Sequence, residues 1–131
     1  MKLLDHVSIS VRDLAKSRPF YLTVMAALDA TVAYDQDDAM GFGERNLRRG
    51  DAHSYITIRQ SPDAVPDSAR HWCFRAETGQ AVRNFDAAGL AAGGSDAGSP
   101  GLRSYHKHYY AAFLLDSDGN KIEAVCHHGD S

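Results

Sequence analysis

An internal repeat is the feature that most constrains the fold. Residues 6–11 (HVSISV) are matched 65 positions later by residues 71–76 (HWCFRA), and Phe20 falls on Phe85 at the same shift. With no gap, this alignment gives the order strand, helix and three strands in each half of the chain. A repeated unit that cannot cover its own sheet packs against a copy of itself. The repeat therefore predicts an α+β fold in which two βαβββ modules form a curved, open, cup-shaped sheet.

The chain has 131 residues, which is enough for one domain with a buried core. We expect module one over about residues 1–60 and module two over about residues 71–131. The segment between them, 61–70 (SPDAVPDSAR), contains two prolines, two aspartates and two serines, and this composition is typical of a linker.

In module one, apolar residues alternate with serines after His6, which predicts a half-buried strand. We expect a helix from about Arg18 to Leu28, with Ser17 as its N-cap, because this start would place Pro19 in the first turn, where proline is tolerated. A hairpin over residues 30–43 and a strand over residues 54–59 should complete the module.

In module two, we expect a strand over residues 71–76 and a helix that is capped by Thr78 and ends at Gly93-Gly94. We expect the glycine-rich stretch 95–104 to be irregular, and residues 93–101 (GGSDAGSPG) to form a mobile rim of the cup. Two strands, over residues 109–115 and 121–126, should be joined by a turn at residues 116–120 (DSDGN). This turn resembles a calcium loop, but it lacks the glutamate expected at loop position twelve.

A single carboxylate interrupts the last apolar strand. Glu123 stands within KIEAVC, where burial of a charged group is costly unless a partner compensates it. A cation, an arginine or a metal ion could be this partner. The function of the chain therefore depends largely on what binds Glu123.

Composition excludes several classes of function. The net charge of −3 and the absence of a basic stripe argue against nucleic acid as the partner. No apolar run is long enough to cross a membrane, and the N-terminus does not resemble a signal peptide. Cys73 and Cys126 lie in apolar runs, where reduced cysteines are the rule. We therefore expect a cytoplasmic protein.

The sequence resembles the vicinal oxygen chelate superfamily, which includes glyoxalases, extradiol dioxygenases, and fosfomycin and bleomycin resistance proteins. The resemblance is carried by Asp5-His6-Val7, by Ser17 with Phe20-Tyr21, by His71, and above all by the terminal segment YYAAFLLDSDGNKIEAVCH. The match extends over nearly the whole chain and implies the same two-module fold.

The resemblance also implies a metal site. The metal ligands of this family lie on the first and last strands of each module, and these positions fall on His6, His71 and Glu123. The fourth position, symmetric to Glu123 in the gapless alignment, is Ile58, which departs from the four-ligand glyoxalase pattern. Two imidazoles and one carboxylate suit one divalent ion, such as Fe, Zn, Ni or Mn. A metal-free pocket in which these residues bind one another remains the alternative.

The residues before the first of the two final strands suggest acid–base chemistry. If His106, His108 and Tyr110 alternate along one strand, they share a face, since side chains two apart point the same way. We take His108 and Tyr110 as candidate catalytic residues, because histidine titrates near neutral pH. An exposed polar edge is the alternative, and it applies most to His106.

Two functions follow. The first is a small metalloenzyme that acts on a small substrate with adjacent oxygens, as a lyase or isomerase of the glyoxalase type or as a dioxygenase. Fosfomycin-type chemistry is disfavoured, because no Arg or Lys follows Glu123 to gather a phosphonate. The second is a protein of the bleomycin-resistance type, which sequesters a ligand without a metal. In both cases the resemblance implies a homodimer, and the linker over residues 61–70 would allow its chains to exchange modules.

Overall fold

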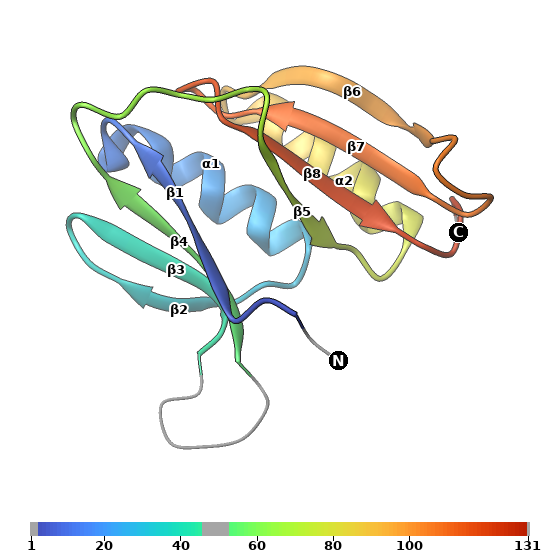
Figure 1. Ribbon diagram of the computed structural model, residues 1–131, viewed down its shortest axis with the longest axis horizontal. Helices are drawn as coiled ribbons and strands as arrows, with labels where there is room; N and C mark the ends of the chain where they lie inside the picture. Colours follow the sequence, from blue (N-terminus) through green and yellow to red (C-terminus); the bar gives the residue numbers. More distant parts are fainter. Residues whose placement is uncertain (1–2, 46–52, 131) are drawn as a thin grey trace.

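The computed structural model describes residues 3–45 and 53–130 and confirms the predicted fold class. Each module is built as one strand, one helix and three further strands, which form a four-stranded sheet (Figure 1). In sheet one the order is β1 (His6–Val11), β4 (Ser54–Gln60), β3 (Ala39–Glu44) and β2 (Val32–Asp35). In sheet two it is β5 (His71–Arg75), β8 (Lys121–Cys126), β7 (Tyr110–Leu115) and β6 (Ser95–Leu102). The first strand of each module pairs in parallel with the last, and the other pairs are antiparallel.

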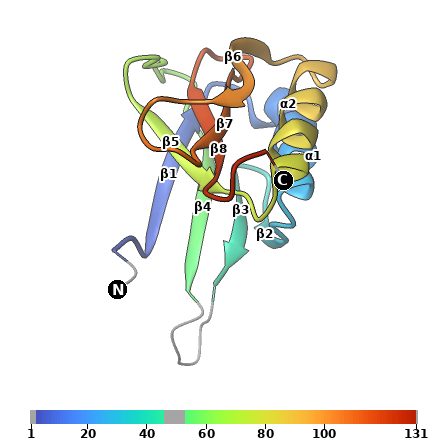
Figure 2. The ribbon, with the colours of Figure 1, turned by 90° about the vertical axis from the view of Figure 1, so that its right-hand side faces the viewer.

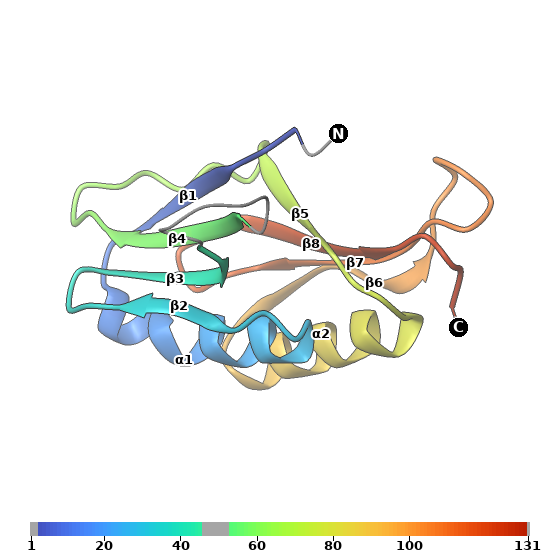
Figure 3. The same ribbon diagram turned by 90° about the horizontal axis from the view of Figure 1, so that it is seen from below.

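The two helices lie side by side in one layer, and the sheets form the other (Figures 2 and 3). Helix α1 (Leu14–Ala27) contacts α2 (Gly79–Ala91), and one hydrophobic core extends through both modules. The core contains Phe20, Phe85 and the apolar residues that alternate along the strands. The opposite side of each sheet, which we call its open face, carries no helix. In the part of the chain that the structure describes, no helix combines the length and apolar character that a membrane crossing needs.

The gapless alignment of the two halves is wrong beyond the first strands and helices. His6 pairs with Tyr55, whereas His71 pairs with Lys121, so the last strands are related by 66 positions rather than 65. The counterpart of Glu123 is therefore Thr57, not Ile58. A shift of one residue moves a strand side chain to the other face of the sheet. Ile58 accordingly lies in the core, and Thr57 lies on the open face of sheet one.

Helix α1 begins earlier than expected. Asp13 is its N-cap residue, and Leu14 and Ser17 are buried inside the helix, so the prediction that Ser17 caps it is wrong. Pro19 therefore falls in the second turn, where the lack of an N–H removes one helical hydrogen bond. Burial of Leu14, Phe20 and Tyr21 against the sheet provides the tertiary packing that propensity alone does not register.

Most elements of module two follow the prediction. Thr78 caps α2 as expected, since its Oγ1 accepts a hydrogen bond from the backbone N–H of Ala81 at 3.1 Å. The stretch expected to be irregular instead contains β6, which pairs with β7 with two register shifts, around Gly98. Antiparallel pairing with β7 makes this stretch a strand, and the local sequence does not reveal that pairing.

A buried carboxylate in the predicted turn ties the modules together. Asp116 Oδ1 accepts the backbone N–H groups of Asp118 (2.9 Å) and Asn120 (2.8 Å), and Tyr21 of α1 donates its hydroxyl to Oδ2 at 2.5 Å. Burial and the neighbouring Asp116 hold the pKa of Tyr21 well above its usual value, so the hydroxyl remains a donor. From the same turn, Asp118 binds the backbone N–H and Nε of Arg12. This turn thus joins module two to the end of β1.

Candidate functional site

The centre of the candidate site is Glu123, midway along β8. Its side chain is only 2% exposed, although it points to the open face of sheet two. His71 Nε2 lies 2.9 Å from Oε1, and Tyr109 donates its hydroxyl to Oε2 at 2.6 Å. Each carboxylate oxygen thus has one protein partner, which offsets the cost of burial.

Strand register brings these groups together. In the parallel pair of β5 with β8, Cys73 stands opposite Glu123, and His71 precedes it by two residues on the same face. On the other side, Phe113 of β7 stands opposite Glu123. The ring of His71 meets that of Phe113 edge-on, with centroids 5.5 Å apart. The carboxylate is therefore enclosed by an imidazole, a phenol, a thiol and a phenyl ring.

The thiol and the phenol beside Glu123 both have raised pKa values. Desolvation and, after it, the charge of Glu123 raise the pKa of the Cys73 thiol to about 12. Desolvation and the hydrogen bond to Glu123 raise the pKa of Tyr109 above its usual value. At neutral pH both groups are therefore protonated, and the phenol donates to the carboxylate.

The structure does not bring His6 to this pair within one chain. His6 lies on β1, with its side chain 52% exposed, hydrogen-bonded to Asp5 at 2.5 Å and stacked on Tyr55. It lines a crevice of about 800 Å³. His71 lines a different pocket of about 410 Å³. Within residues 3–45 and 53–130, no three His, Cys, Asp or Glu side chains are grouped so that they could hold a metal ion.

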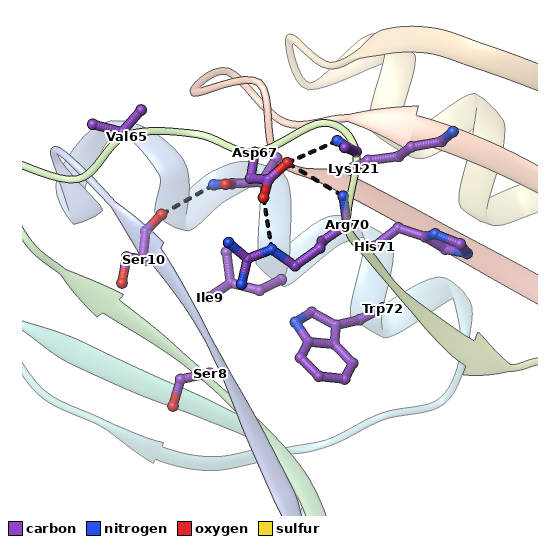
Figure 4. Close-up of a pocket in the computed structure, with 11 residues that line it drawn as sticks. Ser8, Ile9, Ser10, Val65, Asp67, Arg70, His71, Trp72 and Lys121 are labelled. Carbon is purple, nitrogen blue, oxygen red and sulfur yellow. Dashed lines mark hydrogen bonds and ion pairs between the residues drawn. The ribbon is translucent and has the colours of Figure 1, made fainter.

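The smaller pocket lies between β1 and the start of β5, beneath the linker (Figure 4). Ser8 and Ser10 of β1 lie on one side, and Trp72 lies on the other. Within the linker, Asp67 accepts the backbone N–H of Ala69 at 2.9 Å and the Nε of Arg70 at 2.6 Å, which folds this segment into a local turn at the pocket. This pocket therefore reaches from the open face of sheet one to the base of the candidate site.

The two predicted catalytic residues do not join Glu123. Residues 106–108 form a turn rather than a strand, so the alternation that grouped His108 with Tyr110 is absent. Tyr110 is buried on the helix side of β7, where its hydroxyl accepts a hydrogen bond from Arg83 at 3.3 Å. His108 is exposed in the turn.

Sequence reasoning missed the neighbouring Tyr109. Tyr109 and Phe113 are four residues apart, so on an extended strand their side chains lie on the same face. Phe113 stands opposite Glu123, and the register of the final hairpin could therefore have identified Tyr109. The predicted turn over residues 116–120 fixes that register. His106, expected to be an exposed edge residue, is exposed and binds His127 at 2.9 Å between Nε2 and Nδ1.

The donor set still fits a divalent ion in part. An imidazole and a carboxylate are ligands that Fe, Zn, Ni and Mn accept, and a separation of 2.9 Å between Nε2 and Oε1 is compatible with both atoms sharing one ion. Tyr109 would orient the carboxylate from outside, as partners of metal ligands commonly do. One chain would therefore supply two ligands for such an ion, together with the residue that orients the carboxylate.

Solved structures with the same fold are numerous. A glyoxalase/bleomycin resistance protein from Albidiferax ferrireducens T118 is 28% identical, with a TM-score of 0.77 over 94% of this chain and 97% of that one. A putative glyoxalase from Bacillus halodurans is 20% identical, with a TM-score of 0.68 over 95% of each chain. The fosfomycin resistance protein FosX from Listeria monocytogenes, solved as a mutant with Mn(II) and 1S,2S-dihydroxypropylphosphonic acid, is 17% identical, with a TM-score of 0.65 over 95% of this chain and 90% of that one.

The sequence gives the same result at the level of the family. A search of the curated proteins finds no match. The model of one family, however, matches residues 3–124, nearly the full length and both modules. The chain belongs to the Glyoxalase/Bleomycin resistance protein/Dioxygenase superfamily.

Proposed function

We propose that this protein is a small metalloenzyme that binds one divalent ion and acts on a small substrate with two adjacent oxygens. The observation that carries the proposal is the pair His71 and Glu123, a metal-binding imidazole and a buried carboxylate 2.9 Å apart on an open sheet face. A cation there would neutralise the buried charge. The donor types suit Fe, Zn, Ni or Mn.

We further infer that the third ligand is His6 of the partner subunit in a homodimer. His6 lies apart from His71 and Glu123 in its own chain, and the open faces of both sheets are free of helices. If the open face of sheet one in each copy met that of sheet two in the other, a two-fold axis would create two equivalent sites. Such a pairing would leave the helix contact and the core that join the two modules of each chain intact.

The residues around Glu123 would then have distinct roles in binding the ion. Tyr109 holds the carboxylate through its hydroxyl, and His71 must present an unprotonated Nε2, so its proton leaves this atom when an ion binds. A bound ion would polarise the two oxygens of the substrate. The reaction is then of the lyase or isomerase type or a ring-cleaving dioxygenation, and the identity of the ion selects the assay.

Elemental analysis of untagged protein, purified without chelator, tests the metal site. We expect about one divalent ion per chain in the wild type and its loss in His71→Ala and Glu123→Ala, because each change removes a ligand. Thr57→Val, at the equivalent position of sheet one, is the matched control and should keep the metal. A wild type that takes up none of the four ions after incubation would overturn the proposal. Iron would direct assays to catechols under oxygen, and nickel or zinc to hemithioacetals.

Mixing variants tests the shared site. His6→Ala and Glu123→Ala chains should each lack metal alone. In a heterodimer of the two, one site would regain all its ligands, so metal should return to about one ion per dimer. Light scattering that finds only monomers at micromolar concentrations, or a heterodimer without metal, would contradict the assembly.

A second candidate is a ligand-sequestering protein without a metal, as in bleomycin resistance. The observation that favours it is that both oxygens of Glu123 already have hydrogen-bond partners. In that case changes at His6, His71 or Glu123 would leave metal content at zero and ligand binding unchanged.

A further inference from the structure

Two positive charges approach one aromatic ring beside the candidate site. Arg103 Cζ lies 5.6 Å from the centroid of the Phe113 ring, and Lys121 Nζ lies 5.0 Å from it. Phe113 stands opposite Glu123 in the pair of β7 with β8, and Lys121 precedes Glu123 by two residues on the same face. Both cations therefore belong to the open face that carries the His71–Glu123 pair.

The guanidinium of Arg103 is fixed in place. Its Nη1 donates to the carbonyl of Gly101 and its Nη2 to that of Ser99, each at 2.8 Å. An arginine has five N–H donors, so the group keeps donors for another partner after these bonds are made. A cation that is positioned before a ligand arrives loses less side-chain entropy when it binds.

The glycines of β6 make space for this guanidinium. A Cβ atom at Gly98 would lie 3.1 Å from Nη2 of Arg103, and one at Gly101 would lie 3.2 Å from Nη1. Gly98 also has a positive φ of 157°, which favours glycine. The glycine-rich composition of this strand thus allows Arg103 to lie across the sheet toward Phe113.

Neither cation has an acidic partner in the described part of the chain. There, Arg12, Arg18 and Arg70 pair with aspartates, whereas no carboxylate lies within 4 Å of the charged group of Arg103 or Lys121. Two like charges near one ring repel each other, and an anion bound close to them would reduce that repulsion.

We propose that Arg103 and Lys121 form an oxyanion subsite of the candidate site, and that its substrate carries a carboxylate or phosphonate group. The inference rests on the proposed function and specifies its substrate class. The apolar part of the substrate would lie against Phe113, and its adjacent oxygens would be directed toward His71 and Glu123. A phosphonate is disfavoured by the sequence only because no Arg or Lys follows Glu123. The two cations precede it, and strand pairing brings them beside it.

Binding of simple probes to the metal-free protein tests the subsite separately from the metal. Benzoate and phenylphosphonate supply a ring with each anion, and benzyl alcohol is the neutral control. By calorimetry we expect both anions to bind at least tenfold more tightly than benzyl alcohol. Arg103→Gln and Lys121→Met should each weaken anion binding by about tenfold, the usual effect of one charge-assisted contact. Lys16→Met, an equal change of charge on the outer side of α1, should have no effect.

A steric variant separates position from charge. Gly101→Val keeps both cations but places methyl groups where Nη1 of Arg103 lies, so anion affinity should fall although the net charge is unchanged. Wild-type protein that binds neither anion, or binds benzyl alcohol equally well, overturns the proposal. It is also overturned if Arg103→Gln and Lys121→Met bind anions as Lys16→Met does, since the cations would then only cover Phe113.

The same probes distinguish this failure from failure of the metal site. Glu123→Gln should lose metal, yet it should bind benzoate at least as well as the wild type, because a nearby negative charge is removed. A wild type that binds the anions but no metal contradicts only the metal site, and a wild type that binds metal but neither anion contradicts only the subsite.

Discussion

The open faces of the two modules have the same plan but different chemistry. In module two, the hydroxyl of Tyr109 lies 2.6 Å from Oε2 of Glu123, at the centre of the last strand. In module one, the hydroxyl of Tyr34 lies 2.6 Å from Oγ1 of Thr57, which is the structural counterpart of Glu123. Both central side chains are buried. A tyrosine thus satisfies a charged group in one module and a neutral one in the other.

The residue on the neighbouring strand accounts for part of this difference. Phe113 stands opposite Glu123, whereas Gly41 stands opposite Thr57. A Cβ atom at Gly41 would lie 2.3 Å from the ring of Tyr34, so the ring occupies the space that a side chain would take. The tyrosine of module one therefore comes from β2 and covers its own sheet, while module two leaves Glu123 facing His71. The two modules share one strand order, but among the described residues the buried carboxylate and its histidine partner are found only in module two.

The largest difference between the two open faces is expected at the two tyrosines. We expect Tyr109→Phe to weaken metal affinity by about 10- to 100-fold, because the carboxylate loses the group that orients it. The matched change Tyr34→Phe should leave metal affinity unaltered. Titration of both variants with Zn(II) and Mn(II) measures the difference, and equal losses would show that the two faces act alike.

The reactivity of Cys73 depends on Glu123, which only module two carries. Because its pKa is raised to about 12, the thiolate is scarce at pH 8. Alkylation by iodoacetamide should be roughly 50- to 100-fold slower than that of a free cysteine peptide, since the higher nucleophilicity of a basic thiolate offsets only part of its scarcity. The rate should rise as the pH increases toward 12. Glu123→Gln should lower the pKa and accelerate the reaction.

Mass spectrometry can follow Cys73 separately from Cys126, which is buried. A rate at pH 8 that equals that of the peptide, in the wild type, would contradict the proposed environment of the thiol.

Gly41→Ala should have the smallest effect. The added methyl group would displace the ring of Tyr34 and break its hydrogen bond to Thr57, which lowers the free energy of unfolding by about 1 kcal/mol. Urea denaturation measures this change. The double variant Gly41→Ala/Tyr34→Ala is the control: if the clash is the cause, Gly41→Ala should cost less in that background than in the wild type.

Much of the fold could be predicted from the sequence because its signals are local. The alternation after His6, the cap at Thr78 and the turn over residues 116–120 each depend on residues a few positions apart. The start of α1 was predicted incorrectly because burial of Leu14 and Ser17 depends on the sheet. The strand β6 was missed because its glycines favour loops until pairing with β7 is considered.

The candidate site was partly predictable. Glu123 is evident as a charge within an apolar strand, and His71 as the first residue of the repeated strand. Tyr109 and Arg103 were not recognised, because their roles arise from which residues of neighbouring strands stand opposite each other.

The two-module α+β fold, the membership of the family and a buried carboxylate that requires a partner are all evident in the amino-acid sequence. These follow from periodicity, capping and the cost of burying charge, which act within short segments. Strand pairing and module packing were needed to show that Thr57 rather than Ile58 corresponds to Glu123, and that His6 lies apart from His71. The physical reason is that strand pairing and module packing join residues far apart in the chain, and a shift of one residue reverses the face to which a side chain points.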